Sequence, residues 1–207
     1  MSLALYHSPG TRSIRVRWLL EEMELPFELK SIKYDGKYFA SDEFRAINPM
    51  GKVPALFDGE QLVVESIAIM EYLLNKFGPS SLNVGPEEKD YATYLQWLHM
   101  AEGGMANYIA ISFGNKFNRD PYKVSEGYDA YCRYQIEKAL GFLEIQLQGK
   151  EYLLERGFSA ADISLGYTLF FAKSCIDVEF TDTVAKYYAR IMSRPAAQTT
   201  MADLKPS

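Results

Sequence analysis

The feature that most constrains the fold is a cluster of turn-forming residues near the middle of the chain. Residues 78–86 read Gly-Pro-Ser-Ser-Leu-Asn-Val-Gly-Pro, a composition typical of a linker between structural elements. Before this cluster short strand-like runs alternate with helical patterns, whereas after it the apolar patterns have helical spacing. We therefore expect a first domain over 1–78, a linker over 79–87 and a second domain over 88–207.

The first part predicts a small α/β domain. The chain begins with a strand-like run over 3–7, followed by a helical pattern over 12–24 and a second strand-like run over 27–32. A short helix is expected near 41–47. Two more runs (53–57 and 61–64) flank Asp58-Gly59, a hairpin signal, and a helix follows from Ser66 to the break at Gly78-Pro79. The order βαβ-α-ββα indicates a thioredoxin-like fold.

The second part predicts a bundle of helices without strands. Helical spacing covers about 87–117, 121–147, 160–173 and 182–193. Ser159 with Asp162 three residues later is a capping-box variant at the start of the third of these helices. We interpret this pair as structural.

Composition excludes several classes of protein. The 207 residues are 48% hydrophobic and 24% charged, as in globular domains, and the net charge of −5 gives no basic surface for nucleic acid. No apolar stretch approaches the ~20 residues of a membrane span, and the N-terminus lacks the pattern of a secretion signal. Cys132 and Cys175 have neither disulfide-scaffold nor zinc-site spacing. We expect a cytoplasmic protein without a metal.

Residues 48–56, Asn-Pro-Met-Gly-Lys-Val-Pro-Ala-Leu, place a proline at the start of a strand. If the Val53–Pro54 bond is cis, the main chain of Val53 turns outward and pairs with an extended peptide; a trans proline at a strand start is the plainer interpretation.

Glu65 and Ser66 stand between a strand and a helix. As an N-cap, Ser66 needs no further role. Together with the helix N-terminus it also suits a carboxylate, and Glu65 suits an amino group, so the pair would match the end of an α-amino acid.

The turn Ser8-Pro9-Gly10-Thr11-Arg12-Ser13 joins the first strand to the first helix. In one interpretation this segment is only a turn and a helix cap. In the other, its hydroxyls donate hydrogen bonds to a thiolate, and the helix dipole lowers the pKa of that thiol. Because this turn contains no cysteine, the sulfur would have to come from a ligand.

In this order the four motifs resemble cytosolic glutathione transferases over nearly the whole chain. Residues 5–9 with 12–22 resemble the first strand and helix of that family, and 48–56 and 65–73 resemble its glutathione-binding signatures. The pair Ser159–Asp162 sits where the family carries its capping box, and 97–104 resembles the first long helix of bacterial and fungal members.

The resemblance implies a homodimer that uses glutathione as co-substrate and attacks a small hydrophobic electrophile. It implies that Val53, before Pro54, pairs with the cysteinyl backbone, that Glu65 and Ser66 hold the γ-glutamyl end, and that Lys52, or Lys37, meets the glycyl carboxylate. It further implies a contact of a partner subunit's Glu102 with the γ-glutamyl amine. The electrophile pocket is expected to be lined by three residues of the second domain: Met105, Tyr108 and Phe113.

The resemblance leaves the activating residue open among several hydroxyls. Ser13 ranks first and Thr11 second, ahead of Ser8 and Tyr6, and Arg12 would lower the thiol pKa by its charge. The expected activity is that of a glutathione S-transferase. Two alternatives are a glutathione-dependent disulfide reductase or peroxidase and a non-catalytic binding or adaptor protein on the same fold.

Overall fold

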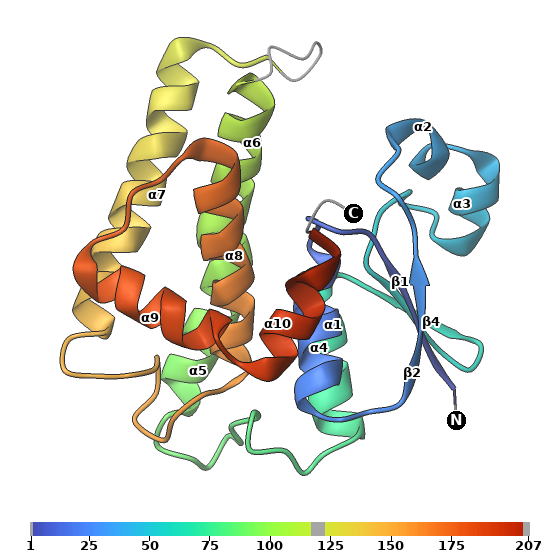
Figure 1. The fold of residues 1–207 in the computed structure, drawn as a ribbon, viewed down its shortest axis with the longest axis horizontal. Helices are drawn as coiled ribbons and strands as arrows, with labels where there is room; N and C mark the ends of the chain where they lie inside the picture. Colours follow the sequence, from blue (N-terminus) through green and yellow to red (C-terminus); the bar gives the residue numbers. More distant parts are fainter. Residues whose placement is uncertain (1, 117–122, 205–207) are drawn as a thin grey trace. The chain divides into compact units, whose positions relative to one another are not determined.

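A computed structural model describes residues 2–116 and 123–204, which divide into two compact units (Figure 1). Unit 1 comprises Met1–Asn83 together with Arg194–Ser207, and unit 2 comprises Val84–Ser193. The expected thioredoxin-like first part and helical second part are both present. The last segment differs from expectation, because its residues group with unit 1 rather than with the helical unit.

Unit 1 is built on a four-stranded sheet in the order β2-β1-β3-β4. The strands are β1 (Leu3–His7), β2 (Phe27–Ser31), β3 (Ala55–Asp58) and β4 (Gln61–Val64). β1 pairs in parallel with β2, whereas β1–β3 and β3–β4 are antiparallel. The β3–β4 hairpin turns at Gly59, whose positive φ of 59° suits glycine.

Helices cover both faces of this sheet (Figure 1). α1 (Ser13–Glu22) and α4 (Ser66–Lys76) pack against each other, and α2 (Gly36–Phe39) and α3 (Asp42–Ile47) form a second pair. Alternate residues of β1 are buried, so that Leu5 and His7 share one face and Tyr6 the other. The short α2 was not expected from the sequence, since it has too few residues to show a helical period.

The end of the chain packs on α1. α10 (Pro195–Met201) and a 3₁₀ turn (Ala202–Leu204) contact this helix. Arg194 forms a bidentate pair with Glu22 at 2.6 and 2.7 Å, and Arg17 pairs with Asp203. Because residues 88–193 separate these partners along the chain, sequence spacing alone does not reveal them.

Unit 2 is helical throughout its regular elements. These are α5 (Tyr91–Met100), a π-helical segment (Ala101–Ala106), α6 (Asn107–Lys116), α7 (Glu126–Gln146), α8 (Ala160–Ile176) and α9 (Asp182–Met192). The helix expected over 87–117 is thus divided by a π-helical turn, a feature that marks functional sites more often than ordinary helix does. Residue 117 of that expected helix, and residues 121 and 122 of the helix expected over 121–147, lie outside the described residues.

Asp162 caps α8 from a fully buried position. One carboxylate oxygen accepts from the Leu153 amide and the Tyr187 hydroxyl, at 3.1 and 3.0 Å. The other accepts from the amide and hydroxyl of Ser159, at 2.8 and 2.9 Å. Burial raises the pKa of Asp162, while these donors oppose the rise. The expected capping pair therefore also joins α8 to α9 and to the segment before α8.

Removing this carboxylate should destabilise the protein strongly. Asp162→Ala leaves several buried donors without an acceptor, and we expect the free energy of unfolding to fall by about 3 kcal/mol or more. Tyr187→Phe removes one donor and serves as the control, with an expected loss of about 1 kcal/mol. Denaturant titration measures both losses. A smaller loss in Asp162→Ala than in Tyr187→Phe would refute the structural role of Asp162.

His7, the last residue of β1, is wholly buried. Burial, together with the nearby positive charge of Arg17, lowers its pKa from 6.5 to about 4, although Asp203 and a hydrogen bond to Ser13 oppose this. The imidazole is therefore neutral at neutral pH.

This burial predicts a specific pH dependence of stability. As the pH falls below 6.5, His7 becomes protonated in the unfolded chain, whereas in the folded chain it stays neutral until about pH 4. The free energy of unfolding therefore falls as the pH falls through this window. The His7→Asn variant cannot titrate there. Between pH 6.5 and 4 the wild type should lose up to about 3 kcal/mol more than this variant in urea titrations. If the free energy of unfolding depended on pH in the same way in both proteins, a buried neutral imidazole at His7 would be contradicted.

Candidate functional site

Three hydroxyl-bearing residues meet at the turn between β1 and α1. The Ser13 hydroxyl lies 2.8 Å from His7 Nδ1 and 2.7 Å from the Thr11 hydroxyl. Ser13 also accepts from the Ser8 amide at 3.2 Å, and Thr11 donates to the Ser8 carbonyl at 2.8 Å. These contacts form a continuous hydrogen-bonded chain from the sheet core to the start of α1.

The members of this chain differ in their access to a ligand. Ser8 and Ser13 are both 0% exposed, whereas Thr11 and Arg12 are partly exposed. The Ser13 hydroxyl, ranked first from the sequence, already contacts His7, Ser8 and Thr11. Among these three residues, Thr11 is the one that is partly exposed to solvent.

Tyr6 lies on the other face of the sheet. Its ring contacts Phe44 and Phe57, at centroid distances of 6.5 and 5.8 Å, and Lys30 Nζ lies 5.5 Å from its centroid. Strand alternation separates it from His7 and from the hydroxyl chain. Tyr6 is thus part of an aromatic cluster with α3 rather than of the β1–α1 turn.

The loop before β3 is held by Asn48, which is 2% exposed. Its side-chain amide donates to the Lys52 carbonyl at 2.6 Å, and its carbonyl oxygen accepts from the Met50 amide. Gly51 has a φ of 62°, and a Cβ there would lie 2.5 Å from the Phe39 carbonyl oxygen, so a side chain is excluded. The Val53–Pro54 bond that follows this loop is cis.

The start of α4 brings together Glu65, Ser66 and a residue that the sequence did not indicate. α4 begins at Ser66 and Glu65 occupies the N-cap position, one residue earlier than the N-cap expected from the sequence. Glu65 is exposed and has a φ of 71°, an uncommon conformation for a residue other than glycine. Arg15 of α1 is wholly buried, and its guanidinium donates to the Ser66 hydroxyl at 3.1 Å.

This arrangement suits a carboxylate. Because the Ser66 oxygen accepts from Arg15, its own O–H remains able to donate to another acceptor. The N-terminus of α4 and the guanidinium charge both favour an anion at this place, while the exposed Glu65 carboxylate favours an adjacent cation. The residues present therefore fit an amino-acid end. The sequence does not single out Arg15, because it is one of three arginines within the six positions 12–17 and no pattern marks it as the one near Ser66.

The cysteines of the chain do not supply a ready nucleophile. Burial raises the pKa of Cys132, and burial raises the pKa of Cys175 to about 11. Neither thiol is appreciably ionised near neutral pH. A reaction that needs a thiolate therefore needs one from a ligand.

The remaining residues singled out from the sequence lie on several elements. In unit 1, Lys52 and Lys37 are exposed, and Val53 is partly exposed. In unit 2, Glu102 and Met105 belong to the π-helical segment, and Met105 is buried. On α6, the ring of Tyr108 lies 6.1 Å from that of Tyr131, and the ring of Phe113 lies 6.0 Å from that of Phe171.

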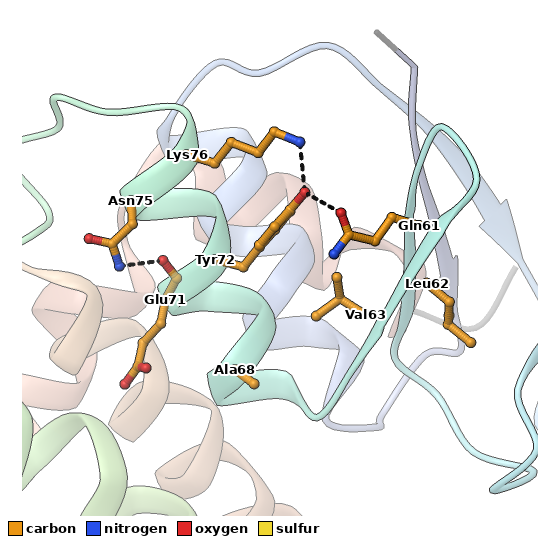
Figure 2. Close-up of a pocket in the computed structure, with 8 residues that line it drawn as sticks. All are labelled: Gln61, Leu62, Val63, Ala68, Glu71, Tyr72, Asn75 and Lys76. Carbon is orange, nitrogen blue, oxygen red and sulfur yellow. Dashed lines mark hydrogen bonds between the residues drawn. The ribbon is translucent and has the colours of Figure 1, made fainter.

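A separate shallow groove runs between β4 and α4 (Figure 2). Two of its polar side chains contact each other, since Lys76 Nζ donates to the Tyr72 hydroxyl at 2.8 Å. Lys76 and Tyr72 also both contact Asp58, outside the groove lining, and hold the pKa of that carboxyl below its usual range. The groove contains none of the residues expected to bind a ligand. Among the described residues no group of three His, Cys, Asp or Glu is placed to hold a metal, and no described helix is long and apolar enough to span a membrane.

Comparison with known proteins gives a consistent family. The family model "Glutathione S-transferase, N-terminal domain" matches residues 1–75. Glutathione S-transferase 3 of Schizosaccharomyces pombe is 29% identical, with 95% of this chain and 85% of that protein covered. Disulfide-bond oxidoreductase YfcG of Escherichia coli is 30% identical, with 93% and 91% covered.

The solved structures agree. The glutathione transferase URE2P6 of Phanerochaete chrysosporium, crystallised with oxidized glutathione, is 27% identical, with 97% of this chain and 95% of that chain covered and a TM-score of 0.82. The four-stranded sheet of unit 1 and the helical unit 2 accord with this likeness. The chain belongs to the glutathione S-transferase family.

Proposed function

We propose that the protein is a glutathione transferase that binds glutathione along unit 1 and uses its thiolate to attack a hydrophobic electrophile. The observation that carries this proposal is the buried Arg15–Ser66 hydrogen bond at the N-terminus of α4. It prepares a hydroxyl donor and a positive charge for the γ-glutamyl carboxylate, and the exposed Glu65 stands beside them for the amino group. Val53, next to cis-Pro54, pairs with the cysteinyl backbone, and Lys52 or Lys37 meets the glycyl carboxylate.

The thiol is activated at the β1–α1 turn. Thr11 supplies the hydroxyl that donates to the sulfur, since it is partly exposed, and Ser13 positions it from a buried site. Arg12, also partly exposed, favours the thiolate by its charge. One charge-assisted hydrogen bond accounts for a fall of one to two units in the thiol pKa, at ~1.4 kcal/mol per unit. With a chlorinated aromatic substrate, a carbon–sulfur bond forms and chloride leaves with the bonding electrons.

Unit 2 supplies the electrophile pocket and the dimer contacts in this proposal. Met105, Tyr108 and Phe113 offer apolar and aromatic surface, which suits hydrophobic substrates of a detoxifying enzyme. In a homodimer, Glu102 from one subunit reaches the γ-glutamyl amine bound by the other. The two free cysteines agree with a cytoplasmic location.

Removing the Ser66 hydroxyl should weaken glutathione binding. A hydrogen bond to a carboxylate contributes about 1.5–3 kcal/mol, so we expect Ser66→Ala to raise the Kd about 10- to 100-fold in calorimetric titrations. Ser66→Thr keeps the hydroxyl and is the matched control, with a Kd within a few-fold of the wild type. Equal Kd values for Ser66→Ala and the wild type would exclude Ser66 from the site.

Removing the Thr11 hydroxyl should act on the thiol rather than on glutathione affinity. We expect Thr11→Ala to raise the pKa of the bound thiol by about one unit and to lower kcat with a chlorinated aromatic substrate about tenfold or more. The Kd for glutathione should stay nearly unchanged, and Thr11→Ser should retain activity. Full activity in Thr11→Ala would assign activation elsewhere, to Arg12 first.

A glutathione-dependent disulfide reductase is the second candidate. The E. coli relative that is named a disulfide-bond oxidoreductase favours it, as does the presence of Thr11 in a turn without cysteine. In that reaction two glutathione thiols reduce one disulfide and become glutathione disulfide. Higher kcat/KM with a small dialkyl disulfide than with aromatic halides would select this function. Binding to glutathione without turnover of either substrate would instead indicate an adaptor.

A further inference from the structure

The hydrogen-bonded chain at the β1–α1 turn has a direction, which depends on the proton of His7. A hydroxyl has one hydrogen to donate and two lone pairs to accept with. Ser13 already accepts from the Ser8 amide at 3.2 Å, and its hydroxyl has His7 Nδ1 and the Thr11 hydroxyl at 2.8 and 2.7 Å. The Ser8 carbonyl, 3.2 Å away, is a third and more distant acceptor. The hydroxyl donates to one acceptor at a time, and the position of the imidazole proton decides whether His7 Nδ1 is one of them.

The buried ring of His7 favours one of its two neutral forms. Within residues 2–116 and 123–204 its Nε2 has no hydrogen-bond partner, although the residue is 0% exposed. A buried N–H without an acceptor is rarer and more costly than an acceptor without a donor. The proton therefore belongs on Nδ1, where Ser13 accepts it, and Nε2 carries the lone pair.

Resting on the proposed function, we propose that His7 is a positioning residue. Its Nδ1 donates to Ser13, which also accepts from the Ser8 amide, so that both lone pairs of Ser13 are occupied and Ser13 donates to Thr11 across the 2.7 Å contact. The Thr11 hydrogen, which goes to the Ser8 carbonyl in the free protein, is then able to turn to the bound sulfur. In the opposite form, with the proton on Nε2, Ser13 donates to His7. Ser13 is then an acceptor for Thr11, whose hydrogen is held in the 2.7 Å contact with Ser13.

The proposal separates three roles within one turn. Thr11, the partly exposed member, meets the ligand, whereas Ser13 and His7 stay buried and act through it. No proton is transferred along the chain: each hydroxyl keeps its own hydrogen and only its direction is fixed. Burial and the charge of Arg17 keep the pKa of His7 near 4, which holds the ring in its neutral state at neutral pH.

Nuclear magnetic resonance tests the direction without any ligand. Long-range ¹H–¹⁵N spectra of the full chain at neutral pH distinguish a protonated Nδ1 from a protonated Nε2, and His7→Asn assigns the signals of the two histidines. We expect Nδ1 of His7 to carry the proton. A protonated Nε2 overturns the proposal, whether or not the protein binds glutathione, so its failure is distinct from failure of the proposed function.

Two variants test the consequence for the bound thiol. Asparagine at position 7 retains an N–H donor for Ser13, whereas leucine retains none. We expect His7→Leu to raise the pKa of bound glutathione, followed by ultraviolet absorbance of the thiolate, and to lower kcat about tenfold with KM for glutathione within about twofold. His7→Asn should restore most of the loss. Equal losses in both variants overturn the proposal; if His7→Leu fails to fold, Ser13→Ala replaces it with the same expected rise in thiol pKa.

Discussion

A buried guanidinium connects the two helix starts on which the site depends. Arg15 lies in α1, near the hydroxyl turn, and donates to Ser66, the first residue of α4. A charge removed from water is favourable only where hydrogen bonds and an anion stabilise it. This contact joins the start of α1 to the start of α4. In the proposed function these two places bind the thiol and a carboxylate of the same ligand.

Strained or irregular backbone gathers at the same places. Glu65 has a φ of 71°, and Gly51 has a conformation and a close neighbour that exclude side chains. Asn48 holds the loop between these features with two side-chain hydrogen bonds. Residues kept in uncommon conformations cluster at binding sites more often than elsewhere. Their positions beside Lys52 and Ser66 in the chain agree with the proposed ligand contacts of those residues.

Local patterns in the sequence predicted most of this fold, whereas contacts between distant residues escaped it. β1 and β4 were predicted to the residue, and the capping pair Ser159–Asp162 is present, because both depend on period and on neighbours in the chain. The return of α10 to α1, the division of the first long helix by a π turn and the burial of Arg15 depend on tertiary packing. That Ser13 is buried and Thr11 partly exposed also depends on tertiary packing, which the ranking of the two hydroxyls from the sequence did not include.

A structure of the protein with glutathione bound tests the account most directly. We expect the γ-glutamyl carboxylate within hydrogen-bond distance of the Ser66 hydroxyl and the sulfur within hydrogen-bond distance of the Thr11 hydroxyl, with Ser13 still buried beneath it. A sulfur placed against Tyr6, or a carboxylate bound away from the start of α4, would contradict the account.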